Sequence, residues 1–301
     1  MGYISLRQNI YKNDSSKRLA LFYTNLEIMK TDIFYINLLS GILSVCNEHG
    51  YELILRCTGE SDYTLNHLVN EHREDYDCMI IHKPLETVTE IPDIPPDVIP
   101  YVMIGRPKIN QGMINYVDTD NIAISYHAVK HLLELNHKRI ILLNGTDSDS
   151  FAEDRLAGYR QALMEYSVEW DPALIFNCGL FFEDSKKIIL ELIKNKVYFT
   201  GVVACGDNAA VGSVNALQEA GLRIPQDVSV VCAGETILTV NNMIPITGID
   251  INGVETGRAA VNLVLDILEK RVITKTHFLT PFTVNVRSST GKTALYNREQ
   301  M

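Results

Sequence analysis

Short runs of hydrophobic residues alternate along this chain with longer amphipathic segments. The run at 18–24 is followed by an amphipathic segment at 32–50 and by a second run at 51–57. Continuous apolar runs of this length are typical of strands buried on both faces, whereas the longer segment has the length and periodicity of a helix. Asp32 stands near the start of that helix and Gly50 at its end, where capping and terminating residues are expected.

The same alternation continues to the end of the chain. Further strands are predicted at 77–82, 101–105, 115–120, 139–145, 174–178, 200–206, 227–234, 246–250 and 277–287. Further helices are predicted at 62–74, 121–137, 151–166, 183–195, 208–221 and 254–271. Strands and helices that alternate in this way form parallel sheets covered by helices on both faces. Two such sets of elements meet near residues 118–122, so the pattern predicts two similar α/β lobes.

A two-lobed α/β chain has a predictable place for a ligand. Ligands of open parallel sheets bind beyond the carboxyl ends of the strands. Two lobes that face each other would therefore hold a ligand in the cleft between them. This organisation fits a hinged binding protein and equally a two-domain enzyme.

Charge and cysteine usage restrict the partners and the compartment. The formal net charge is −10, and an acidic body repels DNA unless a basic element is attached. No signal core precedes the first strand and no stretch reaches 18 uninterrupted apolar residues, so neither export nor membrane insertion is expected. The cysteines form no CxxC pair, and we interpret them as buried, reduced thiols of a cytoplasmic protein. They are Cys46, Cys57, Cys78, Cys178, Cys205 and Cys232.

Motifs of catalysis and of cofactor binding are not found in the sequence. It contains no GxSxG, HExxH, GxxxxGK[ST] or strand-associated GxGxxG motif, so we predict no enzyme activity, no catalytic residue and no cofactor. His127 and His131 have the i, i+4 spacing that can hold a metal. No third ligand is apparent nearby, so structural or surface roles are favoured for both and no metal site is predicted.

Arg155 is the candidate ligand-binding residue with the clearest position. It follows the strand at 139–145 and lies in the first turns of the helix at 151–166, at the carboxyl edge of the predicted sheet. A guanidinium there can donate paired hydrogen bonds to hydroxyl groups or a carboxylate. The alternative is a surface ion pair with Glu153, Asp154 or another acid.

Other candidates lie at the same predicted edge, and each has a structural alternative. Asp207 follows the strand at 200–206 and could reach a ligand, although capping of the next helix is favoured. Phe34 and Tyr35 could stack on a sugar ring or belong to the core. Glu235 follows the strand at 227–234, and its alternative is a solvated loop carboxylate.

Four segments in the second half of the chain form a recognisable series. They read "HAVKHLLELNHKRIILLNG" (127–145), "DRLAGYRQAL" (154–163), "TGVVACGDNAAVGSVNALQEAGLRIPQDVSVVCAGE" (200–235) and "PITGIDINGVETGRAAVNLVLDIL" (245–268). In order and spacing they resemble the signature blocks of the LacI/GalR family of bacterial transcription regulators. The stretch "ALQEAGLRIPQDVSVV" (216–231) is the most specific, and the likeness extends from residue 17 to residue 290.

This resemblance implies a fold and a division of the chain. The fold is α/β, with two Rossmann-like lobes whose parallel sheets are flanked by helices, the periplasmic-binding-protein-like type I arrangement. Residues 18–119 with 248–280 would form the N-terminal lobe, and 120–247 with 281–301 the C-terminal lobe. Residues 1–17 would be a hinge or linker remnant.

The resemblance also implies partners and site residues. The family forms homodimers that bind a small, sugar-like effector between the lobes and operator DNA through a headpiece, which is missing from this chain. The arginine that matches Arg155 contacts the effector in the family. An aromatic pair matching Phe34 and Tyr35 lines the pocket in some members, and the loop matching Asp149 to Phe151 faces it.

The chain departs from the family pattern at two strand ends. Gly206-Asp207 stands where Asn-Asp is common, so an amide that binds hydroxyls is missing. Ala233-Gly234-Glu235 stands where an acidic pair is common, so the first acid is absent. Either Glu235 compensates, or the effector is not a typical free sugar.

The expected function is the effector-binding and dimerisation core of a repressor-type transcription regulator. Gly2 and Tyr3 match the pair that closes the family's headpiece, whereas residues 4–16 match its hinge poorly. The alternative is a stand-alone sugar-binding protein of the same fold without a regulatory output. An enzyme acting in the cleft is a third possibility, and it would need an acid/base pair or cofactor motif that the sequence does not contain.

Overall fold

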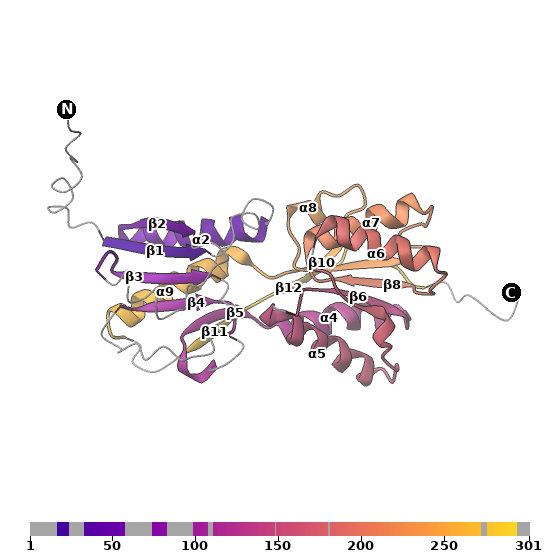
Figure 1. Ribbon diagram of the computed structural model, residues 1–301, viewed down its shortest axis with the longest axis horizontal. Coiled ribbons are helices and arrows are strands. Elements are labelled where there is room, and N and C mark those ends of the chain that lie inside the picture. The colour runs from indigo at the N-terminus through magenta and orange to yellow at the C-terminus, as the bar shows by residue number, and fades with distance from the viewer. Residues whose placement is uncertain are drawn as a thin grey trace, which may run out of the picture.

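The computed structural model of the chain describes residues 17–23, 33–57, 74–82, 99–107, 111–147, 149–179, 181–271 and 276–293. Within them the backbone forms two six-stranded sheets, one in each of two lobes that lie end to end (Figure 1). Every strand pair among them is parallel except β10 with β12. The predicted α/β fold with two parallel sheets is confirmed.

The first sheet has the strand order β11-β5-β4-β3-β1-β2. Its strands are β1 (Lys17–Tyr23), β2 (Tyr51–Cys57), β3 (Cys78–His82), β4 (Tyr101–Ile104), β5 (Tyr116–Thr119) and β11 (His277–Thr280). The helices α2 (Ile33–His49) and α9 (Gly253–Leu268) pack together on one face of this sheet. Gly50 ends α2 with a φ of 71°, a conformation that glycine adopts without strain. Asp32 and residues 62–73 of a predicted helix lie outside the described residues.

The second sheet has the order β12-β10-β9-β8-β6-β7 and is buried on both faces. Its strands are β6 (Ile140–Asn144), β7 (Ile175–Asn177), β8 (Gly201–Ala204), β9 (Ser229–Ala233), β10 (Thr247–Asp250) and β12 (Thr283–Asn285). Its helices are α4 (Asn121–Glu134), α5 (Ser150–Glu165), α6 (Phe182–Lys194), α7 (Asp207–Glu219) and the short α8 (Ile237–Val240). Short 3-10 turns lie at Gln111–Met113 and Pro172–Leu174.

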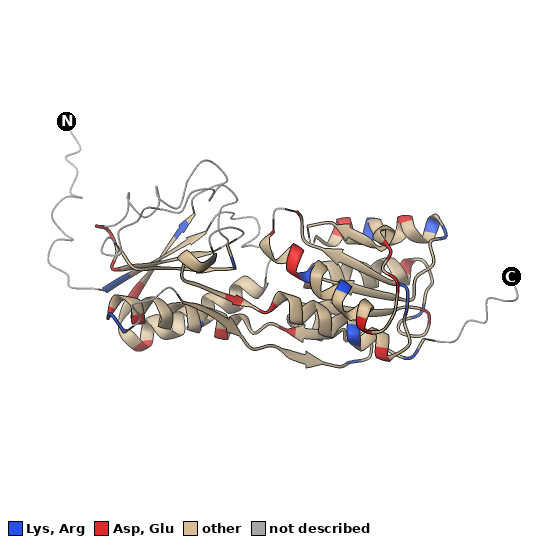
Figure 2. Cartoon of the chain, turned by 90° about the horizontal axis from the view of Figure 1, so that it is seen from below, with Lys and Arg blue, Asp and Glu red and all other residues tan. Residues whose placement is uncertain are grey.

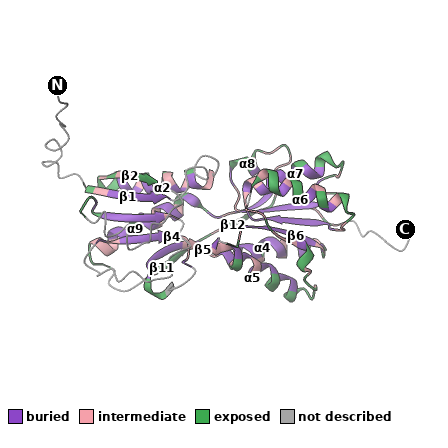
Figure 3. Ribbon diagram, viewed as in Figure 1, coloured by how far each residue is buried: buried purple, intermediate pink, exposed green. Residues whose placement is uncertain are grey.

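Side chains alternate between the two faces of the second sheet. In β9, Val230 and Cys232 pack in the cluster under α6 and α7, while Val231 and Ala233 pack in the cluster under α4 and α5. This alternation follows from the two-residue repeat of a strand and explains why the run is apolar throughout. Figure 3 shows the buried strands between partly exposed helices.

The described chain passes between the lobes three times, and one boundary differs from the prediction. β5 leads into α4, β10 leads into α9, and β11 leads into β12. The division predicted between residues 247 and 248 is wrong by three residues. Residues 248–250 belong to β10, which pairs with β9 and β12 in the second sheet, so the chain crosses after Asp250. The single strand predicted at 277–287 is two strands, one in each sheet.

Glycine sets the distance between paired helices in both lobes. A Cβ on Gly158 of α5 would overlap the carbonyl oxygen of Ile122 in α4, and one on Gly257 of α9 would overlap that of Leu38 in α2. The helix backbones therefore touch where a side chain would hold them apart. Each helix pair covers its sheet as one closely packed layer.

Gly158→Ala should destabilise the fold by about 1–3 kcal/mol, because the added methyl group must push α5 away from α4. Urea unfolding followed by circular dichroism measures this change. Gly112→Ala is the matched control, since a Cβ there meets no atom within 4 Å. Equal stability of the Gly158 variant and the wild type would contradict the close packing.

Candidate ligand-binding site

Arg155 is buried at the carboxyl edge of the second sheet, and its side chain is 5% exposed. Its Nε donates to Oδ1 of Asn121 at 3.1 Å, and its Nη1 donates to the carbonyl oxygen of Cys205. The guanidinium carbon lies 4.6 Å from the ring centre of Phe151. These partners come from the start of α4, the end of β8 and the first turn of α5.

The surroundings of Arg155 rule out the simplest alternative. Its hydrogen bonds go to neutral oxygen atoms and its side chain is buried, so the predicted alternative of a surface ion pair is wrong. The acid that does interact with it electrostatically is the buried Asp118. Among the described residues no acceptor pairs with Nη2. A buried cation with spare donors can hold an oxygen acceptor of a ligand.

The loop after β6 orients Phe151 beneath the guanidinium. Asp149 precedes α5, but its carboxylate accepts from the N–H and hydroxyl of Thr146, both at 2.9 Å, and not from a helix N–H. A Cβ on Gly145 would lie 2.6 Å from the Phe151 ring, so glycine gives that ring its room. Asp149 thus shapes the loop, and Phe151 contacts the arginine.

Asp207 lies two residues after Cys205, and its predicted role as helix cap is wrong. The N-cap of α7 is Gly206, while Asp207 occupies the first helical position. Its carboxylate accepts from the N–H of Asn208 and from the hydroxyl of Thr236, both at 2.6 Å. Burial raises the pKa of Asp207, while these two hydrogen bonds oppose the rise.

Glu235 is not the solvated loop carboxylate of the alternative prediction. Arg287 donates to its two oxygens at 2.6 and 2.9 Å, and Asn285 donates at 2.9 Å. The Glu235 side chain is only 7% exposed. A Cβ on Gly248 would lie 2.5 Å from Oε2, so this glycine makes room for the carboxylate. The negative charge of Glu235 is therefore neutralised inside the second lobe.

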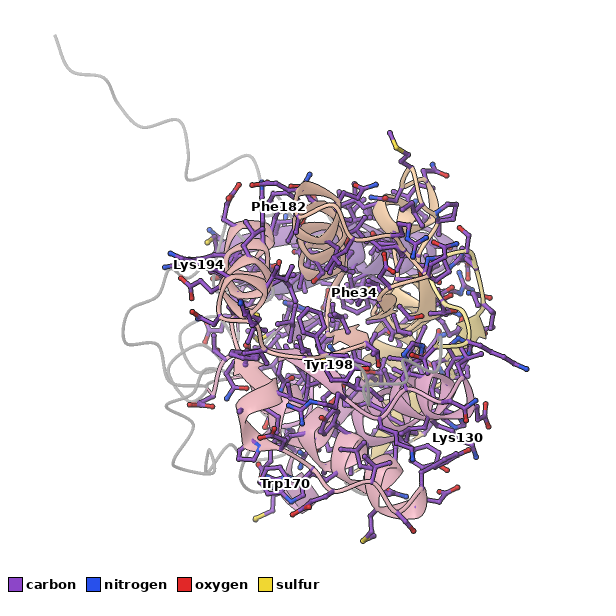
Figure 4. The ribbon with its side chains drawn as sticks, turned by 90° about the vertical axis from the view of Figure 1, so that its right-hand side faces the viewer. Phe34, Lys130, Trp170, Phe182, Lys194 and Tyr198 are labelled. Carbon is purple, nitrogen blue, oxygen red and sulfur yellow. The ribbon has the colours of Figure 1, made fainter. Side chains whose placement is uncertain are left out.

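The two aromatic candidates of the first lobe occupy different places. Phe34 packs against the hydrophobic cluster of the second lobe beneath α4 and α5. Figure 4 shows it near the middle of the molecule in a view from the right-hand side of Figure 1. Tyr35 is buried beside Tyr23 and His82, with ring centres 4.1 and 5.4 Å away. Burial raises the pKa of Tyr35 to about 12.

Sequence reasoning missed Asn121 as a partner of Arg155, and it missed His82, whose ring stacks on Tyr23 at the carboxyl end of the first sheet. Asn121 was assigned to the start of a helix, and only the fold shows that its amide reaches Arg155. His82 ends β3, as Tyr23 ends β1. A search for polar side chains at the last position of each predicted strand would have found His82.

The histidines at 127 and 131 have packing roles. Nε2 of His131 lies 2.9 Å from the hydroxyl of Thr290, and the His127 ring packs against Phe282. Nearby, Nε2 of His137 lies 2.9 Å from the carbonyl of Gly291. Burial lowers the pKa of both His131 and His137. Within the described ranges, no three His, Cys, Asp or Glu residues gather as a metal site would require.

Residues 129–290 match the family model of the periplasmic binding protein-like domain. The chain belongs to this family. It resembles the regulator CelR of Thermobifida fusca, with 25% identity over 93% of this chain and 85% of that protein. The repressor PurR of Haemophilus influenzae is 25% identical over 85% of this chain and 75% of its own length.

Periplasmic-binding-protein-like folds solved by experiment show the same architecture. The complex of CelR with cellobiose superposes with a TM-score of 0.80 at 24% identity, covering 90% of this chain and 84% of that one. Both named relatives are helix-turn-helix transcription regulators. In the described part of the chain no helix is long and apolar enough to span a membrane, and every cysteine there is a free thiol.

The lowered pKa values of His131 and His137 predict a loss of stability in mild acid. The unfolded chain takes up protons near the ordinary histidine pKa of about 6.5, whereas the folded chain resists them, so protonation favours unfolding. The urea concentration at which half of the protein is unfolded should therefore decrease when the pH is lowered from about 7.5 to about 5.5. His137→Gln, which keeps a donor for Gly291, should reduce this fall. His49→Gln at an exposed site is the control, and an unchanged slope in the His137 variant would contradict the assignment.

Proposed function

We propose that the chain is the effector-binding and dimerisation core of a DNA-binding repressor that responds to a sugar or a related metabolite. The proposed role is binding and not catalysis. The observation that carries it is Arg155, a buried guanidinium at the carboxyl edge of the second sheet whose hydrogen bonds go to neutral oxygens and whose Nη2 has no acceptor among the described residues. We place the effector there, between the lobes.

The chemistry of this edge favours a ligand rich in acceptor oxygens. Two acids that follow strands of the second sheet already have donors: Thr236 and Asn208 for Asp207, and Arg287 and Asn285 for Glu235. Arg155 offers donors, and Phe34 and Phe151 offer apolar faces. A sugar has hydroxyl and ring oxygens that accept hydrogen bonds and C–H groups that pack on such faces. The solved relative CelR holds cellobiose, which agrees with this class.

We propose further that the chain forms a homodimer. Among the exposed large apolar side chains, Ile36 and Leu43 lie on α2, and Ile237, Leu238 and Met243 lie on α8 and the turn after it. Ile36 and Leu43 lie seven residues apart, on one face of their helix. Met243 is 89% exposed. Apolar groups of this kind are typical of surfaces that a second copy covers.

Operator DNA is the proposed target of the regulator, reached through a helix-turn-helix headpiece. The core is a poor DNA-binding surface, because its net charge is −10 and acidic and basic residues are interspersed along its helices (Figure 2). Bacterial operators lie in the cytoplasm, so the proposed role implies that location. A stand-alone sugar-binding protein of the same fold is the alternative, and such a protein would be monomeric without a regulatory output.

Arg155→Ala should weaken effector binding by about 10- to 100-fold, the loss expected when a charged donor is removed. A thermal-shift screen of sugars and nucleosides identifies a ligand, since ligands of the native state raise its melting temperature. Calorimetry then compares the wild type with the variant. Arg160→Ala is the control, because Arg160 stacks on Trp170, 4.2 Å from its ring centre, and has no contact with Arg155. Unchanged affinity in the Arg155 variant would reject the proposed site.

Leu238→Glu should convert the dimer to monomers, because a charge would have to be buried at the contact. Sedimentation velocity of the wild type and the variant at micromolar concentration measures this. Met164→Glu is the control, since Met164 is exposed on α5, away from both apolar groups. A monomeric wild type would remove the dimer proposal and favour the stand-alone alternative.

A further inference from the structure

An ion pair joins the two lobes directly beside Arg155. Arg106 follows β4 in the first lobe, and Asp154 lies in α5 of the second lobe. Nε of Arg106 donates to Oδ2 of Asp154 at 3.0 Å, and Nη2 donates to Oδ1 at 2.5 Å. The two side chains are 23% and 17% exposed. A two-point contact of this geometry fixes orientation as well as distance.

The backbone of Arg106 belongs to the same network. Its N–H donates to Oδ2 of Asp118 at 2.9 Å, and Oδ1 of Asp118 accepts from the amide of Asn121 at 3.4 Å. The amide oxygen of Asn121 accepts from Nε of Arg155. Because Asp154 precedes Arg155 in the chain, the contacts close a circuit of five residues that runs through both lobes.

The circuit includes a point where the chain crosses between the lobes. β5 ends at Thr119 and α4 begins at Asn121, so Asp118 and Asn121 lie on either side of the crossing. Burial raises the pKa of Asp118, while hydrogen bonds from the N–H groups of Thr119 and Arg106 oppose the rise. A rotation of one lobe against the other would strain these bonds and the ion pair together.

We propose that Arg106 and Asp154 form an interlobe clasp and that, with Asn121, they are positioning residues for Arg155. They hold the arginine in the orientation that leaves its Nη2 open, and they link that orientation to the angle between the lobes. The inference rests on the proposed ligand site at Arg155. A ligand there and the clasp favour the same lobe arrangement, so residues that touch no ligand control its affinity.

A second ion pair supplies a matched control inside one lobe. Nη2 of Arg139 lies 3.1 Å from Oδ2 of Asp171, and both residues belong to the second lobe. Asp171 also accepts from the N–H of Ala173, a bond that asparagine can keep. Asp171→Asn therefore removes the same charge as Asp154→Asn without affecting a contact between the lobes.

The clasp is tested without any ligand by measuring the distance between two spin labels. One label goes on Cys57, the exposed thiol of β2 in the first lobe, and the other on Lys194→Cys at the end of α6 (Figure 4). Cys178→Ser removes the partly exposed thiol of the second lobe. The labelled protein is mixed with an excess of unlabelled Cys57→Ser protein, so that most dimers that contain label have one labelled protomer and only distances within a protomer are measured.

The wild type and Asp171→Asn should give one narrow distance distribution. Asp154→Asn and Asn121→Ala should raise a second distance population about tenfold, which corresponds to about 1.4 kcal/mol. The charge swap of Arg106→Asp with Asp154→Arg should return the distribution toward the wild type. A distribution in Asp154→Asn that equals that of Asp171→Asn overturns the clasp.

Calorimetry with cellobiose as the probe tests the link to binding in the same variants. If cellobiose binds the wild type, Asp154→Asn should weaken it about tenfold and Asp171→Asn should leave it unchanged. Equal affinities in all three would overturn the positioning role. If the wild type does not bind cellobiose, the proposed function fails for this sugar, and the distance measurement still decides the clasp.

Discussion

A buried cation has to be surrounded by acceptors or aromatic faces, because an unpartnered charge away from water is costly. The second lobe meets this requirement at Arg155 with an amide oxygen of Asn121, a carbonyl of Cys205 and the ring of Phe151. The three come from different elements, so α4, α5 and the end of β8 must be in register before the guanidinium can be buried. None of these three partners is charged, although the buried carboxylate of Asp118 also attracts the guanidinium electrostatically.

Two acidic residues of the same lobe, unlike Arg155, have their hydrogen-bonding atoms engaged by other residues of the protein. Glu235 is matched by Arg287, and Asp207 accepts from Thr236 and Asn208. Their acceptor oxygens are engaged within the protein, whereas a donor of Arg155 is open. Such a site selects ligands mainly by the hydrogen-bond acceptors that they place near Arg155, and only weakly by their hydrogen-bond donors.

The fold could be predicted from the sequence because it depends on local patterns. Apolar runs of strand length alternate with amphipathic segments, and buried parallel strands require that pattern. The partners of the site residues could not be predicted in this way. Arg287 is 52 residues from Glu235, and Thr236 is 29 residues from Asp207. Asp207 also shows how a local rule fails: aspartate is a good cap, but the turn after β8 places Gly206 at the capping position.

The packing within each lobe differs from the contacts between the lobes, and this difference explains how such a core can change shape. In the described residues each hydrophobic cluster lies within one lobe, and Phe34 of the first lobe packs against a cluster of the second. Packed cores resist deformation, so each lobe moves as a rigid body. The contacts described between the lobes include the hydrogen-bonded ion pair of Arg106 with Asp154 and the packing of Phe34. The angle between the lobes is then expected to change more easily than the packing within either lobe. Arg155 lies beside the junction, so a ligand bound there can stabilise one value of that angle.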